Sequence, residues 1–147
     1  MKAFEKLPTE APKTFIFTGN KGNTAIVPDV VGLCLTKSAT WYLIQSLVAG
    51  APTLKAKNVR FYYADERTPE GKGMIFVSGP AHAEFFLQLV EQESQGPVLA
   101  TFVRGKNVGK KGEGKEGRTE FVRFEGDEGA YLPIMARRDW ADDGYGA

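Results

Sequence analysis

Apolar residues recur along the chain with two spacings, and these spacings predict the secondary structure. Short runs rich in β-branched and aromatic residues predict strands at residues 13–18, 25–27, 30–35, 57–64, 73–78, 98–104, 119–124 and 131–135. Apolar positions three and four residues apart predict helices at residues 38–49 and 80–95. Ser38 is suited to cap the first helix, and Pro80 fits the first turn of the second.

The order of these elements predicts an α+β fold that is mainly β. From residue 57 onward the order is strand, strand, helix, strand, long loop and strand. With a first strand drawn from residues 14–35, this order resembles the OB fold, a five-stranded barrel with its helix between strands three and four. The resemblance implies an OB-like antiparallel barrel of five to six strands with two helices, in which the helix at 38–49 is an insertion.

The same pattern divides the chain into three parts. Residues 1–12 are polar and contain proline, which predicts a flexible N-terminal arm. Residues 13–135 form the predicted single OB-like domain, which includes a mobile basic loop at 105–118. Residues 136–147 combine acids and glycines without periodicity, so we expect an acidic, flexible C-terminal tail.

Charge is unevenly distributed, although the net charge of the chain is only +1. Residues 104–123 carry seven bases and three acids, a net charge of +4, whereas residues 124–147 carry two bases and six acids, a net charge of −4. The loop at 105–117 also contains five glycines, which let a backbone approach a polyanion closely. A solvated hairpin tip that only maintains solubility is the simpler alternative.

The strands on either side of this loop each contain Phe-Val-Arg, at residues 102–104 and 121–123. Side chains alternate between the faces of a strand, so Phe and Arg share one face and Val takes the other. If Phe and Arg face outward, they form a platform for base stacking and phosphate neutralisation. The candidate nucleic-acid-binding residues are Arg60, Tyr62, Phe102, Arg104, Lys106, Lys110, Lys111, Lys115, Arg118, Phe121 and Arg123. Cross-strand packing is the alternative for the aromatic residues.

Catalytic motifs are absent from the sequence. His82 is the sole histidine and has no acid or nucleophile at a motif spacing, and Cys34, the sole cysteine, lies in an apolar run. Gly112–Gly117 matches G-x-G-x-x-G, but a strand is predicted after it where the dinucleotide fingerprint needs a helix. These observations predict a protein that is not an enzyme and needs no cofactor or metal. A single cysteine and the lack of a signal peptide or membrane span predict a cytoplasmic location without a membrane partner.

An OB domain, a mobile basic hairpin and an acidic tail together resemble the single-stranded-DNA-binding proteins of bacteria and phages. This resemblance implies sequence-tolerant binding of single-stranded nucleic acid, with DNA as the expected ligand. It also implies a role in DNA replication and recruitment of a protein partner through the tail. The tail departs from the family pattern because it ends in Gly-Tyr-Gly-Ala without a terminal hydrophobic residue. The alternatives are a protein–protein interaction module whose Gly/Lys loop orders on a partner and an enzyme without a recognisable motif.

Overall fold

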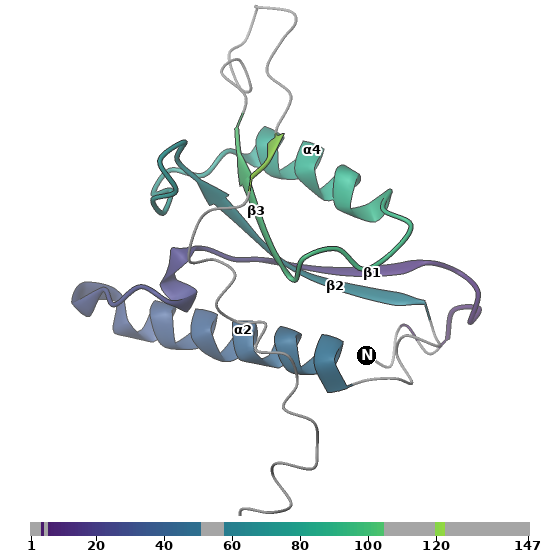
Figure 1. The fold of residues 1–147 in the computed structure, drawn as a ribbon. Coiled ribbons are helices and arrows are strands. Elements are labelled where there is room, and N and C mark those ends of the chain that lie inside the picture. Colours follow the sequence, from purple (N-terminus) through teal and green to yellow (C-terminus); the bar gives the residue numbers. More distant parts are fainter. Residues whose placement is uncertain (1–3, 5, 51–57, 105–119, 123–147) are drawn as a thin grey trace, which may run out of the picture.

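A computed structural model describes residue 4 and residues 6–50, 58–104 and 120–122 (Figure 1). Two helices alternate with three strands along this part of the chain. In order, the elements are β1 (Lys13–Thr18), the 3-10 helices η1 (Lys21–Asn23) and η2 (Pro28–Val30), α2 (Val31–Gly50), β2 (Val59–Arg67), α4 (Gly79–Val90), β3 (Leu99–Val103) and β4 (Glu120–Phe121).

The sheet is open and mostly parallel, with strand order β1-β2-β3-β4. Strand β1 runs parallel to β2, with Phe15 opposite Phe61, and β2 runs parallel to β3, with Ala64 opposite Ala100. Among the described strands, β4 alone is antiparallel to its neighbour, with Phe121 opposite Phe102. The predicted closed antiparallel OB-like barrel is therefore wrong. The helix at 38–49 is a crossover between neighbouring parallel strands, and such a connection is what lets two consecutive strands run in the same direction.

Helix α4 confirms the predicted second helix and its start. The Ser78 hydroxyl accepts a hydrogen bond from the Ala81 amide at 3.3 Å, and Pro80 occupies the first turn. Helix α2 is longer than predicted, because residues 31–37 extend it by nearly two turns, and residues 31–35 within this extension were expected in a strand. The Ser38 hydroxyl does not cap this helix. It donates at 2.9 Å to the carbonyl of Asn23 and so ties α2 to η1.

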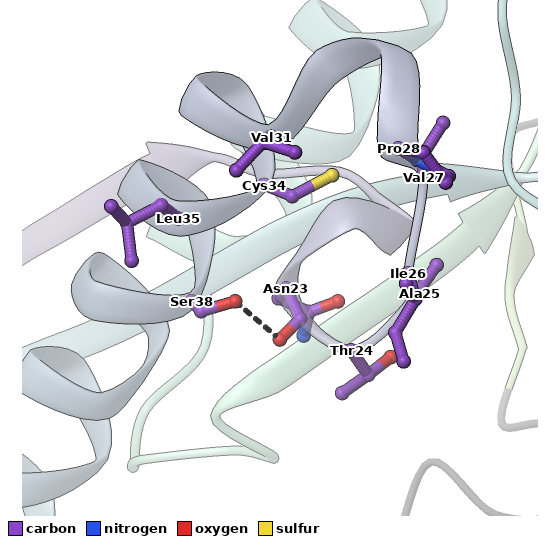
Figure 2. A pocket seen from close by; sticks show the side chains of 10 residues that line it. All are labelled: Asn23, Thr24, Ala25, Ile26, Val27, Pro28, Val31, Cys34, Leu35 and Ser38. Atoms are coloured by element: carbon purple, nitrogen blue, oxygen red, sulfur yellow. Dashed lines mark hydrogen bonds between the residues drawn. The ribbon is translucent and has the colours of Figure 1, made fainter.

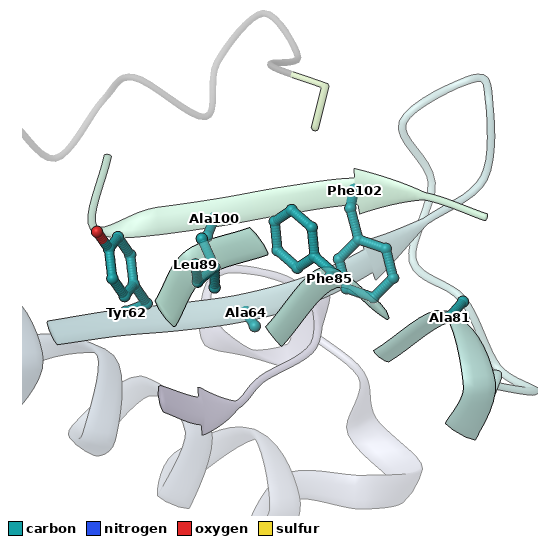
Figure 3. Close-up of a cluster of buried hydrophobic side chains, with 7 residues drawn as sticks. All are labelled: Tyr62, Ala64, Ala81, Phe85, Leu89, Ala100 and Phe102. Carbon is teal, nitrogen blue, oxygen red and sulfur yellow. The ribbon is translucent and has the colours of Figure 1, made fainter. Parts of the chain in front are cut away.

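Two helices cover opposite faces of the sheet, which gives three layers (Figure 1). Under α4, a cluster joins Tyr62, Ala64 and Phe102 to the helix residues Phe85 and Leu89 (Figure 3). Under α2, a second cluster contains Trp41, Ile44, Val59, Phe61, Tyr63 and Val98. Odd- and even-numbered residues of β2 therefore face different helices, and all nine residues of this strand are buried.

The two helical crossovers have opposite hands. Both step across the sheet in the same direction, from β1 to β2 to β3, but α2 and α4 lie on opposite faces. The Gly19 amide bonds to the carbonyl of Ala64, so this carbonyl points toward β1 while the Ala64 side chain faces α4. In a strand of L-residues, the directions of the carbonyl and the side chain of one residue show on which side each neighbouring strand lies. The directions at Ala64 make the α2 crossover right-handed and the α4 crossover left-handed. Left-handed crossovers are rare in parallel sheets.

Several predicted boundaries also differ from the structure. Residues 25–27 and 73–78 do not form strands, apart from an isolated bridge between Gly73 and Arg67. Strand β2 continues through Asp65, Glu66 and Arg67, which we expected in a loop. The predicted last strand and acidic tail lie outside the described residues, and the predicted domain boundaries stay predictions. Among the described residues, no helix is both long enough and apolar enough to cross a membrane.

Candidate functional site

The carboxyl ends of the three parallel strands meet at one edge of the sheet. Strand β1 ends at Thr18, β2 at Arg67 and β3 at Val103. In open α/β sheets, ligands bind in the crevice outside the carboxyl ends of the strands. This edge, which we call the carboxyl edge, is therefore the first place to look for chemistry.

Lys37 places an ammonium group at the carboxyl edge. It lies in the second turn of α2, and its Nζ donates a hydrogen bond of 2.8 Å to the carbonyl of Thr18, the last residue of β1. The same nitrogen is 4.7 Å from the centroid of the Phe17 ring, in a cation–π contact. Partial burial lowers the pKa of Lys37, and the negative charge of Asp65 opposes this shift. Within the described part of the chain, the Thr18 carbonyl is the one acceptor bonded to Nζ, which carries three donors.

The turn after β1 is fixed by Tyr63 on β2. The Tyr63 hydroxyl donates to the carbonyl of Asn20 at 3.0 Å and accepts from the Asn20 amide at 3.2 Å. Its ring lies against Trp41 and Phe17, with centroids 5.4 and 5.6 Å away. Burial raises the pKa of Tyr63 to about 12, so the phenol stays neutral at physiological pH. Tyr63 thus holds the backbone beside Lys37 in place.

Two buried carboxylates at the end of β2 are held by arginines. On the α2 side, Asp65 pairs with Arg67 at 2.6 Å, and Arg67 also donates to the carbonyl of Gly71 at 3.1 Å. These contacts connect the strand end to the loop that follows it. Fully buried pairs of this kind are sensitive to the loss of one partner.

On the α4 side, Glu66 pairs with Arg104 at 2.6 Å and accepts from the Ser78 amide at 2.7 Å. His82 Nδ1 is 3.5 Å from Glu66 Oε2, the oxygen that accepts from the Ser78 amide, and 2.9 Å from the carbonyl of Ser78. Glu66 therefore joins the end of β2, the residue after β3 and the start of α4. Its observed partners make it a structural anchor of the carboxyl edge.

Among the described residues, those expected to bind nucleic acid do not form an exposed platform. Tyr62 and Phe102 are fully buried, and Phe102 stacks on Phe85 with centroids 4.3 Å apart. Arg60 is buried and donates to the carbonyl of Val90 at 3.2 Å. Phe121 lies in β4, opposite Phe102. Arg104 is engaged in the ion pair with Glu66. The other six candidates lie outside the described residues: Lys106, Lys110, Lys111, Lys115, Arg118 and Arg123.

Sequence reasoning missed Lys37. It is the residue before the predicted helix cap Ser38, and the apolar run before it reads as a strand. The available signal was the alternation of strands and helices, which predicts a parallel sheet and a site at its carboxyl edge.

Comparisons with known proteins support a different class of function. The short chain dehydrogenase/reductase dmxR12 of Cryptosporiopsis sp. (strain 8999) is 41% identical to this chain over 106 residues. The match covers 71% of this chain but 42% of that protein, so the chain spans less than half the length of its relative. No protein-family model matches the chain, and no solved structure is significantly similar.

These findings correct the functional predictions. Binding of single-stranded nucleic acid and a role in DNA replication are wrong, because the relative is a dehydrogenase/reductase and the parallel sheet fits a Rossmann-like fragment. The prediction that the protein is not an enzyme is wrong for the same reason.

Proposed function

We propose that this chain takes part in a dehydrogenase or reductase reaction, with the oxygen of the reacting alcohol or carbonyl group bound beside Lys37. The similarity to a short chain dehydrogenase/reductase over 71% of the chain carries this proposal. The parallel β-α-β-α-β order supports it, since this architecture binds ligands where Lys37 lies.

A hydride transfer needs a carrier, and nicotinamide dinucleotides are the usual one in Rossmann-like folds. After β1, Gly19 and Gly22 do not have the spacing of the G-x-G-x-x-G fingerprint, and Gly22 itself lies in the 3-10 helix η1. The strands also run in sequence order across the described sheet, without the reversal of order at which a dinucleotide normally binds. The described residues therefore do not form a cradle for the cofactor's pyrophosphate.

Lys37 can nevertheless assist the reaction at the substrate oxygen. One of its three donors is engaged by the Thr18 carbonyl, which fixes the position of the ammonium group. A positioned cation would stabilise negative charge that develops on a neighbouring substrate oxygen. Partial burial strengthens this effect and lowers the pKa of Lys37, which favours proton transfer to or from the group.

The test is turnover by the purified full chain. Reduced nicotinamide dinucleotides, with and without the phosphate, are incubated with aliphatic and aromatic ketones, and loss of nicotinamide absorbance is followed. If the chain turns over, Lys37→Met should lower kcat by about 10²–10³-fold, as loss of an oxyanion-stabilising donor does. Lys72→Met is the matched control, because Lys72 is exposed in the loop after β2. A chain that neither binds these nucleotides nor oxidises them with any ketone contradicts the proposal.

Two further expectations stay predictions beside this function. The cytoplasmic location is tested by fractionation of cells that produce the protein. Recruitment of a protein partner through residues 136–147 is tested by comparing the full chain with a variant whose acids in that segment are neutralised.

A further inference from the structure

Strand β1 lies at one edge of the described sheet. The Gly19 amide, like that of Lys13, donates to a carbonyl on the β2 side. Backbone groups alternate in direction along a strand, so the N–H and C=O groups of Thr14, Ile16 and Thr18 point away from β2. Among the described residues, no strand pairs with this outward side, which we call the free edge of β1.

The free edge lacks the features that usually keep two sheet edges apart. Folded proteins protect edge strands with exposed lysines, prolines, bulges or inward-pointing charges. The one charged residue of β1, Lys13, is buried, and its Nζ donates to the carbonyls of Pro8 and Ala11 at 2.6 and 2.9 Å. The rest of the strand is β-branched or aromatic, and Phe15 is 39% exposed. Such an edge is a template for another strand.

The sequence of β1 indicates which strand fits there. After its first residue, β1 reads Thr-Phe-Ile-Phe-Thr in either direction. An antiparallel pair of two copies with Ile16 opposite Ile16 therefore places Thr14 opposite Thr18 and Phe15 opposite Phe17. In this register every outward-pointing residue faces an outward-pointing residue, as an antiparallel ladder requires. Like pairs of aromatic residues and of threonines are favourable cross-strand neighbours.

Helix α2 adds an uncharged flank beside the free edge. The Lys37 ammonium group reaches the outward carbonyl of Thr18, so the side of α2 that carries Lys37 lies toward this edge. Leu33 and Thr40, one turn before and one turn after Lys37, share this side, and Leu33 is 48% exposed. Lys37 is the sole charged residue of α2. A short strand pair buries less than the roughly 1,200 Å² of a stable interface, and two facing helix flanks add apolar area to it.

We propose that two copies of this chain form a symmetric dimer in which their β1 strands pair in antiparallel orientation and join the two sheets into one. The two-fold axis passes between the Ile16 residues, so each copy presents the same surface to the other. The Thr14 amide of each copy donates to the Thr18 carbonyl of the other. That carbonyl can still accept from Lys37, because a carbonyl oxygen has two lone pairs.

The dimer brings a residue of the second copy close to Lys37. Phe15 of the second copy stands opposite Phe17, whose ring centroid is 4.7 Å from Lys37 Nζ. This proximity matters for catalysis only if the function proposed above holds. Formation of the dimer needs neither substrate nor nucleotide, so it is tested separately.

Sedimentation velocity of the full chain measures the association directly, and we expect a species of twice the mass of one chain at tens of micromolar protein. Thr14→Pro removes the outward amide but no hydrogen bond to β2, so it should stay folded and weaken the dimer by about tenfold or more. Thr14→Val keeps the amide and should still dimerise, and circular dichroism checks the fold of both. A monomeric full chain, an open series of larger species, or an undiminished dimer of folded Thr14→Pro would overturn the proposal.

A disulfide tests the register, and it does so even if Thr14→Pro fails to fold. Directly opposed residues of a hydrogen-bonded antiparallel pair have Cα atoms about 5.5 Å apart, a distance that a disulfide spans. With the sole native thiol removed by Cys34→Ser, Ile16→Cys should give a covalent dimer on mild oxidation. Ile26→Cys is the matched control, because Ile26 is 95% exposed and lines a pocket in the β1–α2 connection, outside β1 (Figure 2). No covalent dimer of Ile16→Cys, or equal yields from the two variants, would refute the paired strands.

Discussion

Gly19 and Tyr63 are in such close contact that no side chain fits at position 19. A Cβ atom added to Gly19 would overlap the Tyr63 ring. This ring is fully buried and also packs against the ring of Trp41. The glycine is therefore required for steric reasons, since the ring cannot move aside without disturbing the core under α2.

Gly19→Ala should destabilise the protein by about 1–3 kcal/mol, the usual cost of overpacking a filled core. The matched control is Gly32→Ala in the first turn of α2, where an added Cβ meets no atom within 4 Å. That control should be neutral or stabilise by about 0.4–1 kcal/mol, because alanine restricts the unfolded chain. Urea denaturation of both variants measures the difference, and equal midpoints would show that the ring yields.

Tyr63→Phe should weaken folding and flatten its dependence on alkaline pH. The ordinary pKa of 10.0 rises to about 12 in the folded protein, so folding favours the protonated phenol. The stability from this group is fully present below pH 10 and is lost as pH rises from about 10 to about 12. The variant lacks this loss, so its free energy of unfolding should fall less steeply across that interval. Parallel slopes for the two proteins would show that Tyr63 ionises as easily as in the unfolded chain.

Phe102→Ala should cost about 3–5 kcal/mol of stability, because it opens a cavity between β3 and α4. Phe76→Ala is the control of equal chemistry, at a side chain that is 85% exposed. It should change stability by less than about 0.5 kcal/mol. Thermal unfolding of the two variants compares them directly, and a mild effect of Phe102→Ala would mean that its ring is less buried than the structure shows.

Asp65→Asn should destabilise the protein by about 3–5 kcal/mol, because it removes the carboxylate charge that lies 2.6 Å from the buried guanidinium of Arg67. Asp29→Asn makes the same chemical change at an exposed position in η2 and should be nearly silent. Guanidinium chloride would screen charges, so urea is the suitable denaturant. Similar losses in both variants would indicate that the Asp65–Arg67 pair is not a net requirement for folding.

The sequence identifies individual elements of this fold better than their arrangement. The β1 strand and helix α4 follow from alternation, a serine cap and Pro80. Residues 31–35 mislead because valine and leucine in a short run fit a strand as well as a helix with apolar sides. Once that run and residues 73–78 are taken as strands, the alternation of strand and helix is hidden, and the parallel sheet with it.

The candidate site was harder to predict for a related reason. Charged side chains are rarely buried, so the sequence places Asp65, Glu66 and Arg67 in a loop. Their burial is stabilised by ion pairs that form only in the folded protein. Lys37 becomes a candidate only because its side chain reaches the end of β1, where it contacts Thr18, a residue 19 positions earlier in the chain. Such a contact depends on the crossover topology and has no local signature in the sequence.

The complete burial of β2 has a consequence for how the protein opens. Its even-numbered residues belong to the core under α4, and its odd-numbered residues to the core under α2. Separating β2 from either neighbour therefore exposes both cores together, and no partial opening spares one of them. We expect the β2 amides to exchange with deuterium only when the whole molecule unfolds, so their exchange rates should report its global stability.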